Sequence, residues 1–167
     1  YAFDRAEEIG ELTSRLYFYR GKSHAKLDED AKALDDYSRA LQINPDKIDQ
    51  FRVHAYKERA ILFATSRTCP DPPKALRDAE LAWELRGHVP DDQRPVLLYD
   101  IASVYSSLSK SDPTHLEQAV ELVRTAIEDH GILPESLRGQ FADDRYKMLE
   151  PVLQDARILR LLTSENR

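Results

Sequence analysis

The sequence predicts an all-α fold, an α-α superhelix of three helical hairpins that ends in a C-terminal helical cap. Alanines recur in pairs seven residues apart, at Ala33 and Ala40, at Ala75 and Ala82, and at Ala119 and Ala126. Around each pair, apolar side chains recur with a period near 3.6 residues, which is typical of an α-helix that buries one face. Because small residues two turns apart let another helix approach, each pair predicts the second helix of a hairpin.

The spacing between the units supports this repetition. Ala40 and Ala60 are 20 residues apart, and so are Ala82 and Ala102. Only the loop inside each unit varies in length, and loops tolerate insertion. Chance spacing of alanines in a helical bundle is the alternative explanation.

Composition limits the kind of protein. The 167 residues suit one domain, residues 1–167. The net charge of −6 argues against nucleic-acid binding, which needs a basic surface. Cys69 is the only cysteine, so an intrachain disulfide is excluded and a reducing, cytoplasmic location is expected. No apolar run approaches the roughly 20 residues of a membrane span, and no signal-peptide pattern is present.

The first predicted hairpin, residues 14–47, has the most distinctive pattern. It reads Tyr17-x2-Arg20-Gly21-x2-His24, then Ala33-x3-Tyr37, then Pro45. This resembles the tetratricopeptide repeat (TPR), whose signature is W-x2-L-G-x2-Y, then A-x3-F, then P within about 34 residues. Tyr17, Arg20 and His24 stand in place of the Trp, Leu and Tyr of that signature. Asp28 or Asp30 is expected to cap the second helix.

Residues 53–87 and 95–131 repeat the arrangement more loosely. The second unit reads Tyr56-x2-Arg59-Ala60-x2-Phe63, and the third reads Leu98-x2-Ile101-Ala102-x2-Tyr105. Residues 1–13 either extend the leading helix of the first unit or end a preceding repeat. Residues 134–163 are interpreted as capping helices, because a repeat stack needs its last apolar face covered.

A wider resemblance bears on context. The stretch Tyr99-Asp-Ile-Ala-Ser-Val-Tyr105 and residues 143–162 look like TPR regions that follow bacterial serine/threonine kinase domains. The chain also begins at Tyr1 without a methionine. We therefore expect one segment of a larger regulatory protein.

The TPR resemblance implies where a partner would bind. In that family the leading helix of each unit lines a concave groove with its second, fifth, ninth and twelfth residues. The matching residues are Arg15, Phe18, Lys22 and Ala25 in the first unit, His54, Lys57, Ile61 and Ala64 in the second, and Val96, Tyr99, Ser103 and Ser106 in the third. Of these, the predicted binding groove comprises Arg15, Phe18, Lys22, His54, Lys57, Ile61, Tyr99 and Ser103.

The chemistry of these residues suggests an extended acidic segment with an occasional large apolar side chain as the partner. A solvated face that binds nothing is the alternative. Some TPR domains hold chaperone C-terminal carboxylates with Lys and Asn. The matching positions here carry Phe18, Lys22, Ile61 and Ser103, so a chaperone tail is not expected.

The sequence lacks the patterns that catalysis would need. It has no glycine-rich phosphate loop, no G-x-S-x-G, no H-E-x-x-H and no C-x-x-C. We therefore predict no catalytic residue, no metal site and no cofactor. The leading hypothesis is a noncatalytic scaffold that binds a protein or peptide partner. The alternative is a structural domain that forms homo-oligomers by stacking its apolar ends.

Overall fold

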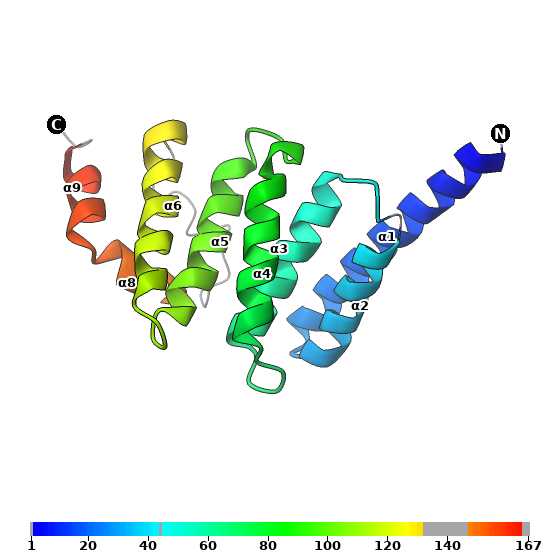
Figure 1. Cartoon of the computed structure of the whole chain (residues 1–167), viewed down its shortest axis with the longest axis horizontal. Coiled ribbons are helices and arrows are strands. Elements are labelled where there is room, and N and C mark those ends of the chain that lie inside the picture. Colours follow the sequence, from blue (N-terminus) through cyan, green and yellow to red (C-terminus); the bar gives the residue numbers. More distant parts are fainter. Residues whose placement is uncertain (1, 44, 132–146, 165–167) are drawn as a thin grey trace. The chain divides into compact units, whose positions relative to one another are not determined.

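The helices of this computed structural model pair in the order of the chain (Figure 1). The structure describes residues 2–43, 45–131 and 147–164. The helices are α1 (Ala2–Lys26), α2 (Asp30–Gln42), α3 (Gln50–Thr65), α4 (Pro72–Glu84), the 3₁₀ helix η1 (Leu85–His88), α5 (Arg94–Leu108), α6 (Thr114–His130), α8 (Glu150–Leu153) and α9 (Ala156–Ser164). The described residues contain no strand, which confirms the all-α prediction.

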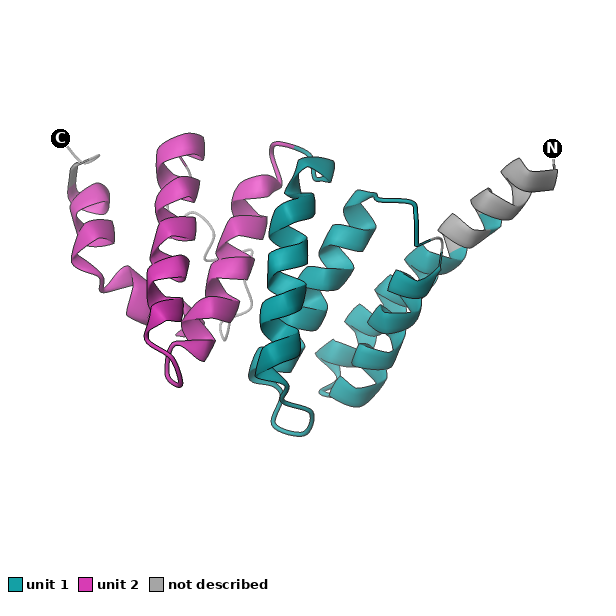
Figure 2. Ribbon diagram, viewed as in Figure 1, with its two compact units in different colours: residues 1–90 teal, residues 91–167 magenta. Residues whose placement is uncertain are grey.

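The chain divides into two compact units (Figure 2). Residues 1–90 hold the hairpins α1–α2 and α3–α4 together with η1, and residues 91–167 hold the hairpin α5–α6 with α8 and α9. The three hairpins begin at Ala2, Gln50 and Arg94. Helix α1 is continuous from Ala2 to Lys26, so residues 2–13 are helical with the rest of it. None of the described helices is both long enough and apolar enough to cross a membrane.

The first hairpin closes at small residues, as the pattern implied. Ala33 and Ala40 of α2 are buried, and Tyr37 between them packs against Gly21 of α1. Leu41 of α2 and Ala55 of α3 belong to the same buried cluster, so one core joins the two hairpins of residues 1–90. Burial of apolar surface of this kind is the main favourable contribution to folding.

Local signals in the sequence explain where the helices begin and end. Asp49 caps α3, since its Oδ1 accepts a hydrogen bond from the backbone N–H of Arg52 at 2.9 Å. Asp71 caps α4 in the same way, and Pro72 follows in the first turn, where proline is tolerated. Gly131 ends α6 with a φ of 62°, a left-handed conformation that glycine adopts readily.

One predicted cap is wrong. The residue before α2 is Glu29, not Asp28 or Asp30, and its side chain makes no capping hydrogen bond. Asp28 adopts a φ of 57° in the turn, which directs the chain into α2. The Glu29 carboxylate instead accepts hydrogen bonds from side chains, as described below.

Residues 91–167 are organised around α5, which is buried along most of its length. Leu149, Val152 and Ile158 of the C-terminal segment are buried as well. Arg157 of α9 donates two hydrogen bonds to the carboxylate of Glu117 on α6, at 2.7 and 3.1 Å. Helices α8 and α9 therefore pack on α6. The part of the predicted cap between residues 134 and 146 lies outside the described residues.

Candidate functional site

Residues from α1 and α3 form a group of aromatic and cationic side chains in residues 1–90. The ring of Phe18 stacks on that of His54, with centroids 6.5 Å apart, and lies 6.0 Å from the ring of Phe51. Tyr19 contacts Phe18 and Phe51 edge-on, at centroid distances of 5.3 and 6.1 Å. Edge-to-face pairs of this kind add to the stabilisation from burial. Tyr19 remains 54% exposed, so the group reaches the surface.

Two cations adjoin these rings. The Arg15 guanidinium lies 4.5 Å from the centroid of Phe51, and the Lys22 ammonium lies 5.8 Å from that of Phe18. Both distances allow a cation–π interaction, which is worth about 0.5–1 kcal/mol at an exposed site. We call this group the aromatic–cationic cluster. Its members are Arg15, Phe18, Tyr19, Lys22, Phe51 and His54.

The cluster contains four of the residues that the sequence indicated and two that it did not. Arg15, Phe18, Lys22 and His54 were predicted, whereas Tyr19 and Phe51 were missed. Phe51 stands three residues before His54, so both lie on one face of α3. Tyr19 stands three residues before Lys22 on α1. This spacing could have identified both residues.

Two other predicted residues of α3 lie below the surface. Lys57 is only 8% exposed, and its ammonium lies 3.0 Å from the carboxylate of Glu58, which is also buried. Ile61 is buried too. The sequence interpretation treated Lys57 as an exposed cation, and the structure differs because neighbouring atoms cover the side chain. A buried ion pair contributes little net stability, but loss of one partner is costly.

The two predicted residues of the third hairpin are buried within residues 91–167. Tyr99 and Ser103 on α5 have no exposed surface, and the Ser103 hydroxyl donates to the backbone carbonyl of Asp100 at 2.7 Å. Ser106, one turn further on, donates to the backbone carbonyl of Met148 at 2.5 Å. The C-terminal segment thus occupies this end of the α5 face.

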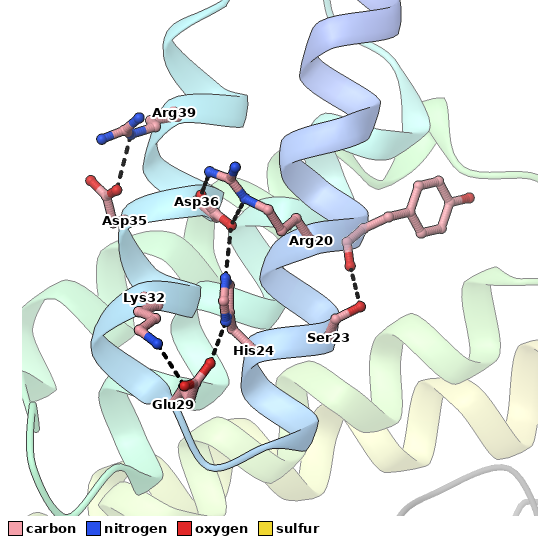
Figure 3. A network of polar contacts seen from close by, with 9 residues as sticks. Arg20, Ser23, His24, Glu29, Lys32, Asp35, Asp36 and Arg39 are labelled. Carbon is pink, nitrogen blue, oxygen red and sulfur yellow. Dashed lines mark hydrogen bonds and ion pairs between the residues drawn. The ribbon is translucent and has the colours of Figure 1, made fainter.

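A second constellation joins α1 to α2 (Figure 3). Arg20 donates from Nε and Nη2 to the two carboxylate oxygens of Asp36, at 2.7 and 2.5 Å. His24 lies between two acids, with Nδ1 2.5 Å from Glu29 and Nε2 3.8 Å from Asp36. Lys32 adds a 2.6 Å contact to Glu29. Figure 3 shows these side chains bridging the two helices in a continuous network.

This network lowers the pKa of both carboxyl groups. Hydrogen bonds from Arg20 stabilise the carboxylate of Asp36 and hold its pKa below the ordinary value, although burial opposes the shift. Hydrogen bonds from Lys32 and then His24 lower the pKa of Glu29. The network links α1 to α2. Arg20 and His24 therefore hold the hairpin together through polar contacts, at positions where the TPR signature has Leu and Tyr.

The second hairpin repeats the ion pair. Arg59 donates from Nε and Nη2 to Asp78 at 2.6 and 2.8 Å, in the geometry of Arg20 with Asp36. Both arginines precede the small residue of the helix crossing. In the third hairpin the equivalent positions carry Ile101 and Leu122, which are buried. At these two facing positions, the first and second hairpins thus carry a bidentate ion pair and the third carries two aliphatic side chains.

The described residues contain no group of potential metal ligands. Within 2–43, 45–131 and 147–164, no three His, Cys, Asp or Glu side chains are grouped so that they could hold a metal ion. Cys69 is a free, partly buried thiol, and its backbone N–H donates to Ser66 Oγ at 3.0 Å.

An all-α chain of hairpins that cross at small residues defines a helical-repeat protein. The model of the tetratricopeptide repeat family matches residues 14–47, so this segment is similar to one tetratricopeptide repeat. Repeats of this family generally mediate interactions between proteins and are typically noncatalytic. Comparison with curated proteins and with solved structures gave no match. The resemblance to regions that follow kinase domains stays a prediction.

Proposed function

We propose that the chain is a noncatalytic scaffold that binds an extended acidic segment of a partner protein at the aromatic–cationic cluster. The observation that carries this proposal is the position of Arg15 and Lys22 beside the rings of Phe51 and Phe18, in a group whose Tyr19 is 54% exposed. Lys22 is partly exposed, and within the described residues its ammonium forms no ion pair. A surface of this kind suits one segment of a larger regulatory protein.

The chemistry of the cluster indicates what the partner must carry. Carboxylates of the partner would approach Arg15 and Lys22, and a large apolar side chain would pack beside Tyr19. The two cations are seven residues apart on α1, so their Cα atoms are about 10 Å apart along the helix. An extended chain covers that distance in about three residues. Attraction of charges would steer the encounter and weaken as salt screens it.

The test measures the affinity of a fluorescent twelve-residue peptide that carries Asp and Glu around one Phe. A peptide with Lys in place of the acids is the negative control. Lys22→Glu should weaken binding roughly tenfold, because an attraction of up to about 1 kcal/mol becomes a repulsion of similar size. Lys26→Glu is the matched control, since Lys26 is an exposed lysine one turn further along α1.

Two results would contradict the proposal. One is equal affinity of the wild type and the Lys22→Glu variant for the acidic peptide. The other is equal binding of the acidic and the basic peptide. In either case the cluster is a solvated face, and the structural role through the apolar ends becomes the stronger hypothesis.

A further inference from the structure

One face of α1 is exposed at Ile9, Leu16, Arg20 and Ser23 and half-buried at Thr13. Its residues are spaced alternately by three and four, so they lie on one side of the helix. They are Ile9, Thr13, Leu16, Arg20, Ser23 and, in the turn that follows, Leu27. We call this the uncovered face. Leu16 on α1 is 63% exposed and Leu27 in the turn is 69% exposed, so this side of the hairpin presents two large apolar side chains to solvent.

The same face of α3 is covered. Gly21 and Ala60 hold equivalent positions at the helix crossings. Each residue of α1 therefore corresponds to the α3 residue whose number is higher by 39. Ala55 therefore corresponds to Leu16, yet it is only 1% exposed, because it packs in the core with Leu41 of α2. Ser66 corresponds to Leu27 and is 8% exposed. In the second hairpin, this face binds the second helix of the hairpin before it.

Polar contacts show how α3 recognises α2. Arg52 donates from Nη2 to the backbone carbonyl of Leu41 at 2.9 Å. Arg59 holds Asp78 with Nε and Nη2 and donates from Nη1 to Ser38 Oγ at 3.0 Å. One guanidinium thus joins its own hairpin and the preceding one. A planar group with donors on several sides suits this double role.

Arg20 repeats half of this arrangement. It holds Asp36 with Nε and Nη2, as Arg59 holds Asp78. Its Nη1 has no acceptor within the described part of the chain, and its side chain is 56% exposed against 20% for Arg59. The donor that binds Ser38 in the second hairpin therefore faces outward in the first.

We propose that the uncovered face binds the second helix of a further hairpin of the same class. That helix would run antiparallel to α1, place a serine or threonine hydroxyl against Nη1 of Arg20, and set an apolar residue one turn later against Leu16. The α2 segment Ser38–Leu41 is the template, because it makes these contacts with α3. This surface is separate from the aromatic–cationic cluster, so neither proposal depends on the other.

A tandem chain tests the proposal. Residues 1–49 are joined directly to residues 11–167, which places a copy of α2 before α1 with the connection that natively leads into α3. The copied helix should bury Leu16, raise the melting temperature by several degrees and slow hydrogen exchange of the α1 amides. Ser38→Ala in the added copy should remove part of this gain, because Arg20 loses its acceptor.

The matched controls use Leu16. Leu16→Glu in the downstream copy should abolish the gain, whereas the same substitution in the unextended chain should leave the melting temperature unchanged. An unaltered melting temperature and unaltered exchange in the tandem chain would overturn the proposal, and circular dichroism of the added hairpin excludes simple misfolding. Dimers of the unextended chain that Leu16→Glu dissociates would also overturn it, since the face would then pair with a second copy.

Discussion

Gly21 and Tyr37 meet at the crossing of α1 and α2, where a Cβ on Gly21 would lie 2.8 Å from Cε1 of Tyr37. That distance is too short for two carbon atoms. The phenol ring is buried against the α1 backbone, and only glycine leaves room for it. The glycine of the repeat pattern is thus required by the close approach of the ring.

Gly21→Ala should therefore destabilise the chain. Overpacking costs roughly 1–3 kcal/mol, and the better helix propensity of alanine offsets about 1 kcal/mol of it. The free energy of unfolding in urea should fall by up to about 2 kcal/mol. Gly87→Ala is the control, because a Cβ there meets no atom within 4 Å. Equal stability of the two variants would show that the ring moves aside without cost.

Ala40→Glu should destabilise the first hairpin more strongly. Ala40 is buried, so the longer side chain overpacks the crossing at a cost of roughly 1–3 kcal/mol, and burial of an unpaired carboxylate adds to that. Thermal unfolding followed by circular dichroism measures the effect. Ala31→Glu places the same side chain at an exposed position of the same helix and should be nearly silent. A melting temperature for Ala40→Glu close to that of Ala31→Glu would contradict the packing described here.

The ion pair of Arg20 with Asp36 can be replaced by two aliphatic residues. Arg20→Leu alone should lower the melting temperature, because the carboxylate of Asp36 is buried and loses both hydrogen bonds from Arg20. Arg20→Leu combined with Asp36→Leu should recover most of the loss, since the third hairpin carries Ile101 and Leu122 at these positions. A double variant less stable than Arg20→Leu would contradict this expectation, because removal of the unpaired carboxylate would then bring no gain in stability.

Stability should decrease in acid. Glu29 and Asp36 both have lowered pKa values in the folded chain, so they contribute stability above their ordinary pKa values. That contribution is lost as the pH falls through the folded pKa values and the carboxylates become protonated. The melting temperature between pH 7 and pH 3 should therefore fall less steeply in Asp36→Asn than in the wild type. Parallel curves would show that Asp36 does not contribute to the acid sensitivity.

Much of the fold could be predicted from local pattern. The alanine pairs, Gly21 and the cap residue types mark helices and crossings, because they act over one or two turns of one segment. The angular position of a residue on its helix also follows from spacing, which is why Arg15, Phe18 and Lys22 were placed together. The cap of α2 was missed because the left-handed turn at Asp28 shifts the first helical residue.

Tertiary structure alone decided which of these faces is open. Phe18, Lys57 and Tyr99 hold equivalent positions on their helices, and all are buried, although spacing indicated a shared binding surface. The sequence determined the helices, the crossings and the side on which each residue lies. The structure determined what covers that side. Burial depends on atoms from segments far along the chain, and the periodicity of one helix does not indicate which segments pack against it. Leu16 and Ala55 illustrate this point, since one helical position is exposed in α1 and buried in α3.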